Sequence, residues 1–305
     1  MKDGHSIPRR DFLRWSALIG AQAALASTAL KAAARAGGLV GQVPDLAVAH
    51  GDSPARNGLA AVEALGGFGR FVRAGDVVAI KPNPVGRNRP EDAINTHPDL
   101  LEAVIRECKR VGAKEVIVFS NDEQRSFVAN GLAAAIERAG GTLQALGQVD
   151  QFREVVVPRG RILRTERLAA TLLDADVFIN MPIAKHHAGS EVTGAMKNLM
   201  GVNWDRLHFH QTDLHQCIAE LSSAVRPDLI IMDANYVLLT NGPAGPGEVR
   251  NAKQVIASVD PVAVDAFITR AFFGEPARIG HIQAAYDLGV GEMDLAKLRI
   301  QELNV

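Results

Sequence analysis

From residue 44 onward, short runs rich in β-branched residues alternate with helix-like segments. The runs predict strands at 45–49, 77–81, 115–120, 154–157, 176–180, 229–233 and 254–259. The segments between them predict helices at 54–65, 98–111, 125–139, 164–173, 213–225, 261–273 and 281–288. This alternation is typical of an α/β fold, a mostly parallel sheet flanked by helices, built as one large domain or as two interleaved lobes.

Two polar segments that follow predicted strands are unusually long, at 81–98 and 181–211. Ligands of open parallel sheets collect beyond the carboxyl ends of the strands. Long loops inside a compact domain usually form sites or lids. We therefore expect the chemistry of the chain in these two segments.

Three lysines, Lys81, Lys185 and Lys197, lie at or just beyond predicted strand ends. A lysine beside apolar neighbours is costly to bury unless an anion pairs with it. The lysines therefore predict a shared site for a carboxylate or a phosphate, and the alternative is that each reaches water separately. Neutral hydrogen bonds to the same ligand are expected from Asn83, Thr193 and Asn198.

Five of the nine histidines fall between residues 186 and 215. Such density indicates proton transfer, metal binding or anion binding, and the alternative is a solvated polar loop. His187 beside Lys197 is a candidate acid/base. His208 and His210 have a spacing that could ligate a metal, completed by Asp213 or His215.

Asp233 ends the apolar run Leu229–Met232. A carboxylate at a strand end is a candidate catalytic or metal-binding group. A structural hydrogen bond from the following loop is an equally good interpretation of Asp233.

The first 36 residues predict an export signal rather than part of the fold. Arg9 and Arg10 precede Phe12 and Leu13, and an Ala-rich stretch leads to a small-residue cleavage site at 34–36. This pattern resembles a twin-arginine signal, which implies the twin-arginine translocase as a partner and a periplasmic or extracytoplasmic location. Removal of its six basic and two acidic residues takes the formal net charge from −1 to −5, and residues 37–305 form the predicted α/β domain.

Composition excludes some functions. No basic face is present to neutralise phosphates, which argues against a nucleic-acid binder. Cys108 and Cys217, the chain's two cysteines, cannot by themselves hold a four-thiolate iron–sulfur cluster.

Several blocks together resemble the domain of unknown function 362 family over about residues 45–300. They are 80–83 (IKPN), 96–98 (THP), 176–182 (DVFINMP), 185–187 (KHH), 193–201 (TGAMKNLMG), 226–228 (RPD) and 260–265 (DPVAVD). Many relatives carry ferredoxin-type cysteine motifs that this chain lacks. The resemblance therefore implies the fold and the site but no assigned activity and no intrinsic cluster.

Residues 187–197 also resemble a segment of the lactate racemase family. In that family the histidine is an acid/base, the lysine tethers a nickel-pincer nucleotide and a later histidine ligates nickel. The resemblance implies such roles for His187 and Lys197, with His208, His210 or His215 as the later ligand. Here, however, residues 119–122 (FSND) replace the family's Gly-Thr-His segment, so one member of the proton-transfer pair is missing.

We therefore expect an exported protein that binds an anionic small molecule or cofactor, with a metal or a nucleotide-derived group as candidates. Proton transfer next to a carboxylate or phosphoryl group is the chemistry that these side chains support. The alternative is a non-catalytic ligand-binding or maturation factor for an exported redox partner.

Overall fold

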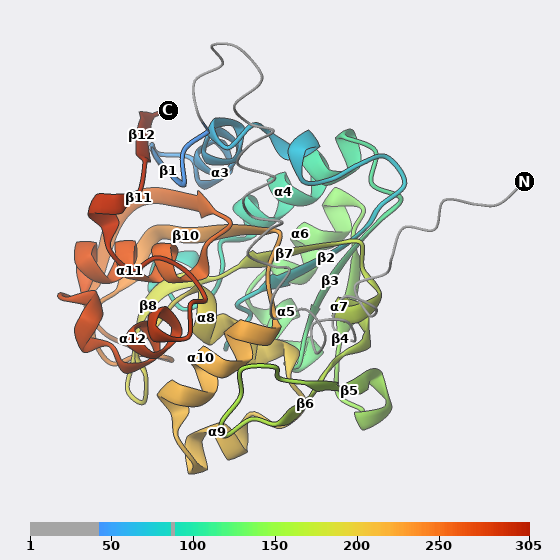
Figure 1. Cartoon of the computed structure of the whole chain (residues 1–305). Helices are drawn as coiled ribbons and strands as arrows, with labels where there is room; N and C mark the ends of the chain where they lie inside the picture. The colour runs from blue at the N-terminus through green and yellow to red at the C-terminus, as the bar shows by residue number, and fades with distance from the viewer. Residues whose placement is uncertain (1–42, 87–88) are drawn as a thin grey trace, which may run out of the picture.

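The structure, a computed structural model, describes residues 43–86 and 89–305 (Figure 1). The predicted export signal lies outside these residues. Within them, no helix is both long and apolar enough to cross a membrane.

The described residues form a ten-stranded mixed sheet, in which eight strands follow the order β12-β1-β11-β10-β7-β2-β3-β4 and β8 and β9 branch from β10. The run from β10 through β7, β2 and β3 to β4 is parallel, whereas β11 is antiparallel to both β1 and β10. The strands are β1 (Leu46–His50), β2 (Val77–Pro82), β3 (Glu115–Ser120), β4 (Thr142–Ala145), β7 (Val177–Met181), β8 (Ile183–His187), β9 (Glu191–Thr193), β10 (Leu229–Leu238), β11 (Val249–Ser258) and β12 (Ile300–Asn304). A separate antiparallel hairpin consists of β5 (Phe152–Val156) and β6 (Thr165–Ala169).

Alternation along the strands divides the interior into two hydrophobic layers. Val78 and Ile80 of β2 face one core, whereas Ala79 faces the opposite core. The α-helices of the first core are α3 (Pro54–Ala64), α4 (Pro98–Arg110), α5 (Gln124–Ala129) and α6 (Leu132–Ala139). Those of the second are α7 (Ala170–Asp174), α8 (Ala195–Asn198), α9 (Leu207–Gln211), α10 (Leu214–Ala224), α11 (Pro261–Phe272) and α12 (Gly280–Asp287). Helices cover both faces of a mostly parallel sheet, so the predicted α/β fold is confirmed.

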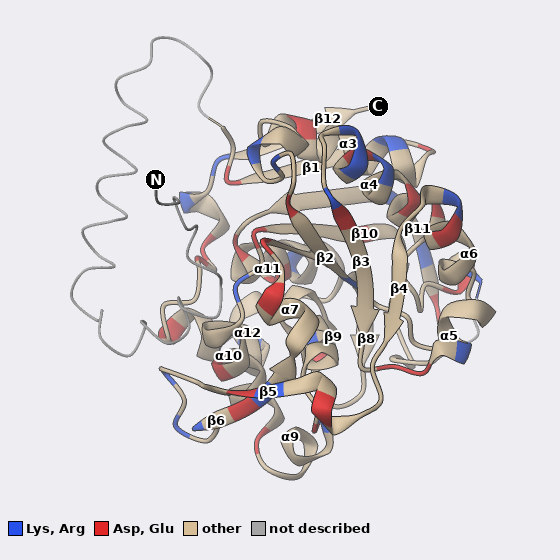
Figure 2. Ribbon diagram, turned by 90° about the vertical axis from the view of Figure 1, so that its right-hand side faces the viewer, with Lys and Arg blue, Asp and Glu red and all other residues tan. Residues whose placement is uncertain are grey.

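Helix boundaries follow local capping chemistry. Asp260 precedes the proline that begins α11, and its carboxylate accepts hydrogen bonds from the backbone N–H groups of Val262 and Ala263. The predicted helix at 125–139 is two helices, α5 (Gln124–Ala129) and α6, because Gly131 between them adopts a φ of +82°. Outer elements carry Lys/Arg and Asp/Glu interspersed rather than gathered on one face (Figure 2).

Two predicted segments are wrong in detail. The helix expected at 164–173 begins instead as strand β6, which pairs with β5 before the short helix α7. The long loop expected at 181–211 folds into β8, β9, α8, the 3₁₀ helix η4 (Leu199–Val202) and α9 (Leu207–Gln211). Strands β4, β8, β9 and β12 were not predicted, since they are short or largely polar.

Candidate functional site

A cavity of about 110 Å³ lies beyond the carboxyl ends of β2 and β7. These strands are parallel neighbours, and their register places Lys81 beside Asn180, so both strands deliver polar groups to one edge of the sheet. β8 and β9 form the adjoining wall, with Lys185 directly across from Thr193. The lining side chains include all three predicted lysines, and the polar members are Lys81, Asn83, Asp122, Lys185, His187, Thr193, Lys197, Asn198 and Arg206.

Two of the lysines are almost completely enclosed. Lys81 is 2% exposed and Lys185 is 1% exposed. The Lys81 ammonium donates to the carbonyl of Pro82 and, at 3.3 Å, to Oδ1 of Asn198. The Lys185 ammonium donates to the carbonyl of Ile94 at 2.7 Å and to Oδ1 of Asn83 at 3.2 Å. Neutral oxygens therefore hold both groups.

A chain of amides fixes the floor of the cavity. The side-chain nitrogen of Asn83 donates to Oδ1 of Asn198 at 3.0 Å, and that of Asn198 donates to Oδ1 of Asn180 at 2.8 Å. Asn180 in turn donates to the carbonyl of Ala195 at 2.9 Å. Because each amide is committed on both sides, the network holds the two lysines in a fixed geometry.

The cavity carries an excess of positive charge. Among the described residues, the ion pairs include none between a carboxylate and any of the three lysines. Asp122 is the acidic side chain of the lining, and it already pairs with Arg206 at 3.1 Å and accepts from the Ser120 hydroxyl at 2.5 Å. One carboxylate therefore faces four cationic side chains.

Burial and this mutual repulsion shift the titration of the lysines. Desolvation is the largest cause in each case, and it lowers the pKa of Lys81 and of Lys185 to about 7. Desolvation and then the charge of Arg206 lower the pKa of Lys197 to about 8, against the opposing effect of Asp122. Near neutral pH each lysine is thus poised between ammonium and amine.

Thr193 offers an unused hydrogen-bonding group in the same wall. Its side chain is 3% exposed and lines the cavity, and its hydroxyl oxygen has no hydrogen-bond partner in the structure. Buried hydroxyl groups are normally paired, so an unpaired one at a cavity points to a ligand.

The contacts of His187 determine where its proton lies. Its Nδ1 faces the backbone N–H groups of Gly189 at 3.0 Å and Ser190 at 3.2 Å, so Nδ1 is an acceptor. Burial, with the nearby charges of Lys197 and Lys185, lowers the pKa of His187 to about 3. The imidazole is therefore neutral and carries its proton on Nε2, which makes it a hydrogen-bond donor in the resting state.

Two further groups, Asp265 and Gly201, position the lysines. Asp265 on α11 accepts hydrogen bonds from the backbone N–H groups of Ala195 and Met196 and so anchors α8, which carries Lys197. Gly201 lies against the end of Lys81, where a methyl group would come within 2.7 Å of Nζ. Gly201 lies in the block at 193–201 and Asp265 in the block at 260–265. The resemblance of these blocks to the family is the sequence signal that could identify both residues.

Asp233 lies outside the cavity and holds two segments of the backbone together. Its carboxylate accepts from the backbone N–H of His97 at 2.7 Å and from both nitrogens of Asn235, the backbone at 3.0 Å and the side chain at 2.7 Å. It is not among the residues that line the cavity. These contacts tie the segment around His97 to β10 and favour the structural interpretation of Asp233.

The later histidines diverge. His208 pairs with Glu166 at 3.2 Å, whereas His210 stacks on His187 with ring centroids 6.2 Å apart, and His215 stacks on His281. Across residues 43–86 and 89–305, no group of three or more His, Cys, Asp or Glu side chains is placed to hold a metal ion. The expected convergence of His208 and His210 on one metal ion is therefore wrong for the described residues.

Comparison with known proteins agrees with the sequence pattern. A family model described as domain of unknown function (DUF362) matches residues 78–270. The chain belongs to this family. A thylakoid-associated protein of Synechocystis sp. (strain ATCC 27184 / PCC 6803 / Kazusa) is 32% identical over 244 residues, which cover 75% of this chain and 73% of the relative.

Two solved structures are more distant. The lactate racemase apoprotein from Thermoanaerobacterium thermosaccharolyticum has a TM-score of 0.40 at 10% identity, and a protein from Thermotoga maritima has a TM-score of 0.44 at 11% identity. The matches cover 82% and 78% of this chain, which spans 58% and 60% of the two solved chains.

Proposed function

We propose that this DUF362 protein binds a small anionic molecule, through a carboxylate or phosphoryl group, in the lysine-lined cavity. The observation that carries the proposal is the set of three lysines without a carboxylate partner around an unpaired, buried Thr193 hydroxyl. An anion there would balance the positive charge of the buried ammonium groups, which have lost their hydration. It would also accept a hydrogen bond from the Thr193 hydroxyl. The cavity volume suits one such head group, with the rest of the ligand extending outward.

The same groups support proton transfer at the bound molecule. An amine with a pKa near 7 or 8, as burial gives Lys81, Lys185 and Lys197, can both accept and return a proton at neutral pH. The neutral His187, with its proton on Nε2, would polarise a carbonyl or phosphoryl oxygen as a donor. Lys197 is the proposed base, because it is the least enclosed of the three.

A second candidate function is that of a non-catalytic carrier or maturation factor for an exported redox partner. It shares the anion site and the proposed export through the twin-arginine translocase, which rests on Arg9 and Arg10. It differs in that no bond of the ligand changes.

Isothermal titration of the full chain with sulfate, inorganic phosphate and succinate tests the anion site. Saturable binding that is lost in Lys185→Met but retained in Lys114→Met, an exposed lysine that does not line the cavity, is the expected result. Binding unaffected by Lys185→Met would refute the site.

Proton transfer is tested by incubating the protein with 2-hydroxy and 2-oxo carboxylates in D₂O and following by NMR the loss of the C2 proton of the hydroxy acids and of the C3 protons of the oxo acids. Exchange that disappears in Lys197→Met supports the enzyme. Tight binding without exchange for these probes would favour the carrier.

A further inference from the structure

A second hollow, of about 400 Å³, lies between the β5–β6 hairpin and the segment that leads into α9. It shares no lining residue with the anion cavity. Its walls are Glu154, Thr165, Glu166, Arg167, Asn203, Trp204, Asp205 and His208. The proposed function leaves all of these side chains without a role.

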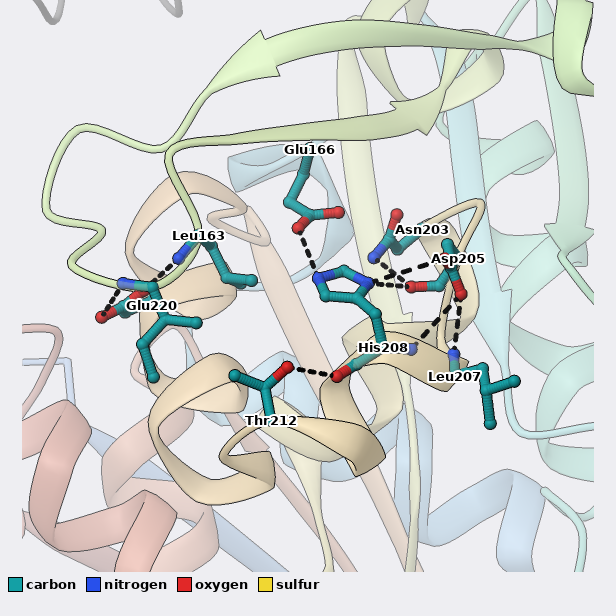
Figure 3. Close-up of polar contacts among 9 residues, drawn as sticks. Leu163, Glu166, Asn203, Asp205, Leu207, His208, Thr212 and Glu220 are labelled. Atoms are coloured by element: carbon teal, nitrogen blue, oxygen red, sulfur yellow. Dashed lines mark hydrogen bonds and ion pairs between the residues drawn. The ribbon is translucent and has the colours of Figure 1, made fainter.

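Glu166 and His208 meet in this hollow and share one proton (Figure 3). Nδ1 of His208 lies 3.0 Å from the carbonyl oxygen of Asp205, and because a carbonyl only accepts, Nδ1 must carry a hydrogen. Nε2 lies 3.2 Å from Oε1 of Glu166, so a single proton occupies the space between them. Whichever atom holds that proton, the pair as a whole is neutral.

Asn203 presents an unsatisfied acceptor to the same space. Its side chain is fully buried, and its Oδ1 has no partner in the structure. The amide nitrogen donates to the carbonyl of Asp205 at 3.2 Å, which fixes the orientation of the amide. Figure 3 shows the oxygen turned away from Asp205, toward the strand that carries Glu166. An acceptor without a donor calls for a ligand that brings an N–H or an O–H.

The charged and aromatic side chains of the hollow narrow the chemical class of the ligand further. Glu154, Glu166 and Asp205 line the hollow against one guanidinium, Arg167, and the half-buried Trp204 adds an aromatic wall. Carboxylates, an unpaired amide oxygen and an indole together suit an organic ammonium ion, because aromatic rings attract cations. A neutral polyol would satisfy the amide oxygen, but it would leave the two remaining carboxylates, of Glu154 and Asp205, balanced only by the single guanidinium of Arg167.

We propose that this hollow is a binding site for a small organic ammonium ion, held by Glu166 and Oδ1 of Asn203 beside the Trp204 ring. The cation replaces the proton shared by Glu166 and His208, so that Glu166 faces the ligand as a carboxylate and His208 remains neutral. Arg167, Glu154 and Asp205 face the site as well, and they set its overall charge. Binding therefore releases about one proton, the one that lies between Glu166 and His208.

The experiment uses Trp204 as the reporter. The chain has two tryptophans, and Trp15→Phe in the full-length protein leaves Trp204 as the single one. Its fluorescence is titrated with 1,4-diaminobutane and, as a matched neutral probe, with 1,4-butanediol. Saturable quenching by the diamine alone, weakened at least tenfold in Glu166→Gln and unchanged in Glu137→Gln on α6, is the expected result.

Calorimetry in two buffers of different ionisation enthalpy then measures the released proton. Glu154→Gln, an exposed carboxylate of the same wall, provides a milder loss if Glu166→Gln does not fold. Equal binding of the diol, displacement of the diamine by Mg²⁺, absence of saturation or absence of proton release would each overturn the proposal.

Discussion

At the scale of single residues, the three lysines determine what the cavity is. The position of Lys81 near the end of β2 could be predicted from the sequence, because an apolar run that ends in a lysine marks the carboxyl edge of a sheet. Lys185 and Lys197 depart from that prediction, since Lys185 lies within β8 and Lys197 lies on the short helix α8. The partners could not be predicted, since Asp122 and Arg206 are 84 residues apart in the chain and meet only in the fold. His187 also needed the structure, because its tautomer depends on two backbone N–H groups of a turn.

Lys81→Met should stabilise the protein at pH 6 while it abolishes anion binding. Desolvation of a buried ammonium costs several kcal/mol, whereas the two neutral hydrogen bonds of Lys81 contribute about 1 kcal/mol each. A gain of about 1–3 kcal/mol in the free energy of unfolding is expected by denaturant titration. Lys114→Met serves as the control, with no change in stability or binding.

The sign of this effect depends on pH. The pKa of Lys81 falls from 10.5 in the unfolded chain to about 7 in the fold, so the penalty is complete below pH 7 and fades as pH rises to 10.5. The advantage of Lys81→Met should therefore be present at pH 6 and absent at pH 10. A constant difference at both values would contradict the burial of a charged Lys81.

Affinity for sulfate should fall as pH rises from 6 to 9. Sulfate keeps its charge over this range, and the lysines lose theirs, since burial lowers the pKa of Lys81 and Lys185 to about 7 and that of Lys197 to about 8. Calorimetric titration at four pH values measures the change, with a fall of about tenfold or more expected. His187 stays neutral throughout, so a loss of binding below pH 6 would contradict this account.

At the scale of elements, the segment at 181–211 departs most from its prediction. It contains two short strands and three short helices where polarity indicated a loop. The four-residue helix α8 is held in place by Asp265, from 67 residues beyond its last residue, so local propensity carries little information about it. β6 shows the same limit. The residue types at 164–173 favour a helix, but pairing with β5 makes the first part of this segment a strand and buries Glu166.

Gly201→Ala should weaken anion binding by about tenfold with the fold intact. The new methyl group would lie 2.7 Å from Nζ of Lys81 and 3.0 Å from the Ser120 hydroxyl, so the ammonium must leave its position. Gly69→Ala is the matched control, since nothing lies within 4 Å of the added carbon. Calorimetry with sulfate and a thermal melt of both variants check the prediction. Unchanged binding in Gly201→Ala would show that Lys81 does not contact the anion.

At the scale of the whole molecule, the alternation of strands and helices predicted the α/β class and most element positions, because both faces of the sheet are covered and the apolar runs are long. The edge strand β12 escaped prediction, since its alternating polar residues resemble a tail. The neutral hydrogen-bond network around the lysines also escaped prediction, because it assembles from three strands, one helix and the segment that follows β2.

The proposed export concerns the whole chain and predicts a defined phenotype. Replacing Arg9 and Arg10 with lysine should retain the precursor in the cytoplasm, folded and able to bind sulfate, because the translocase reads the arginine pair. Cell fractionation with immunodetection measures the distribution. An undiminished periplasmic yield of the processed form would refute the signal.

The segment at 203–210 contributes residues to both the hollow and the lysine cavity. Asn203, Trp204, Asp205 and His208 line the hollow under the hairpin, Arg206 lines the lysine cavity, and His210 stacks on His187. A ligand that displaces this segment in the hollow therefore alters the lysine cavity, and the converse holds for a ligand of the cavity. Thermodynamic reciprocity then requires the anion and the ammonium ion to change each other's affinity by the same factor. The occupancy of each site would therefore depend on the concentrations of both ligands.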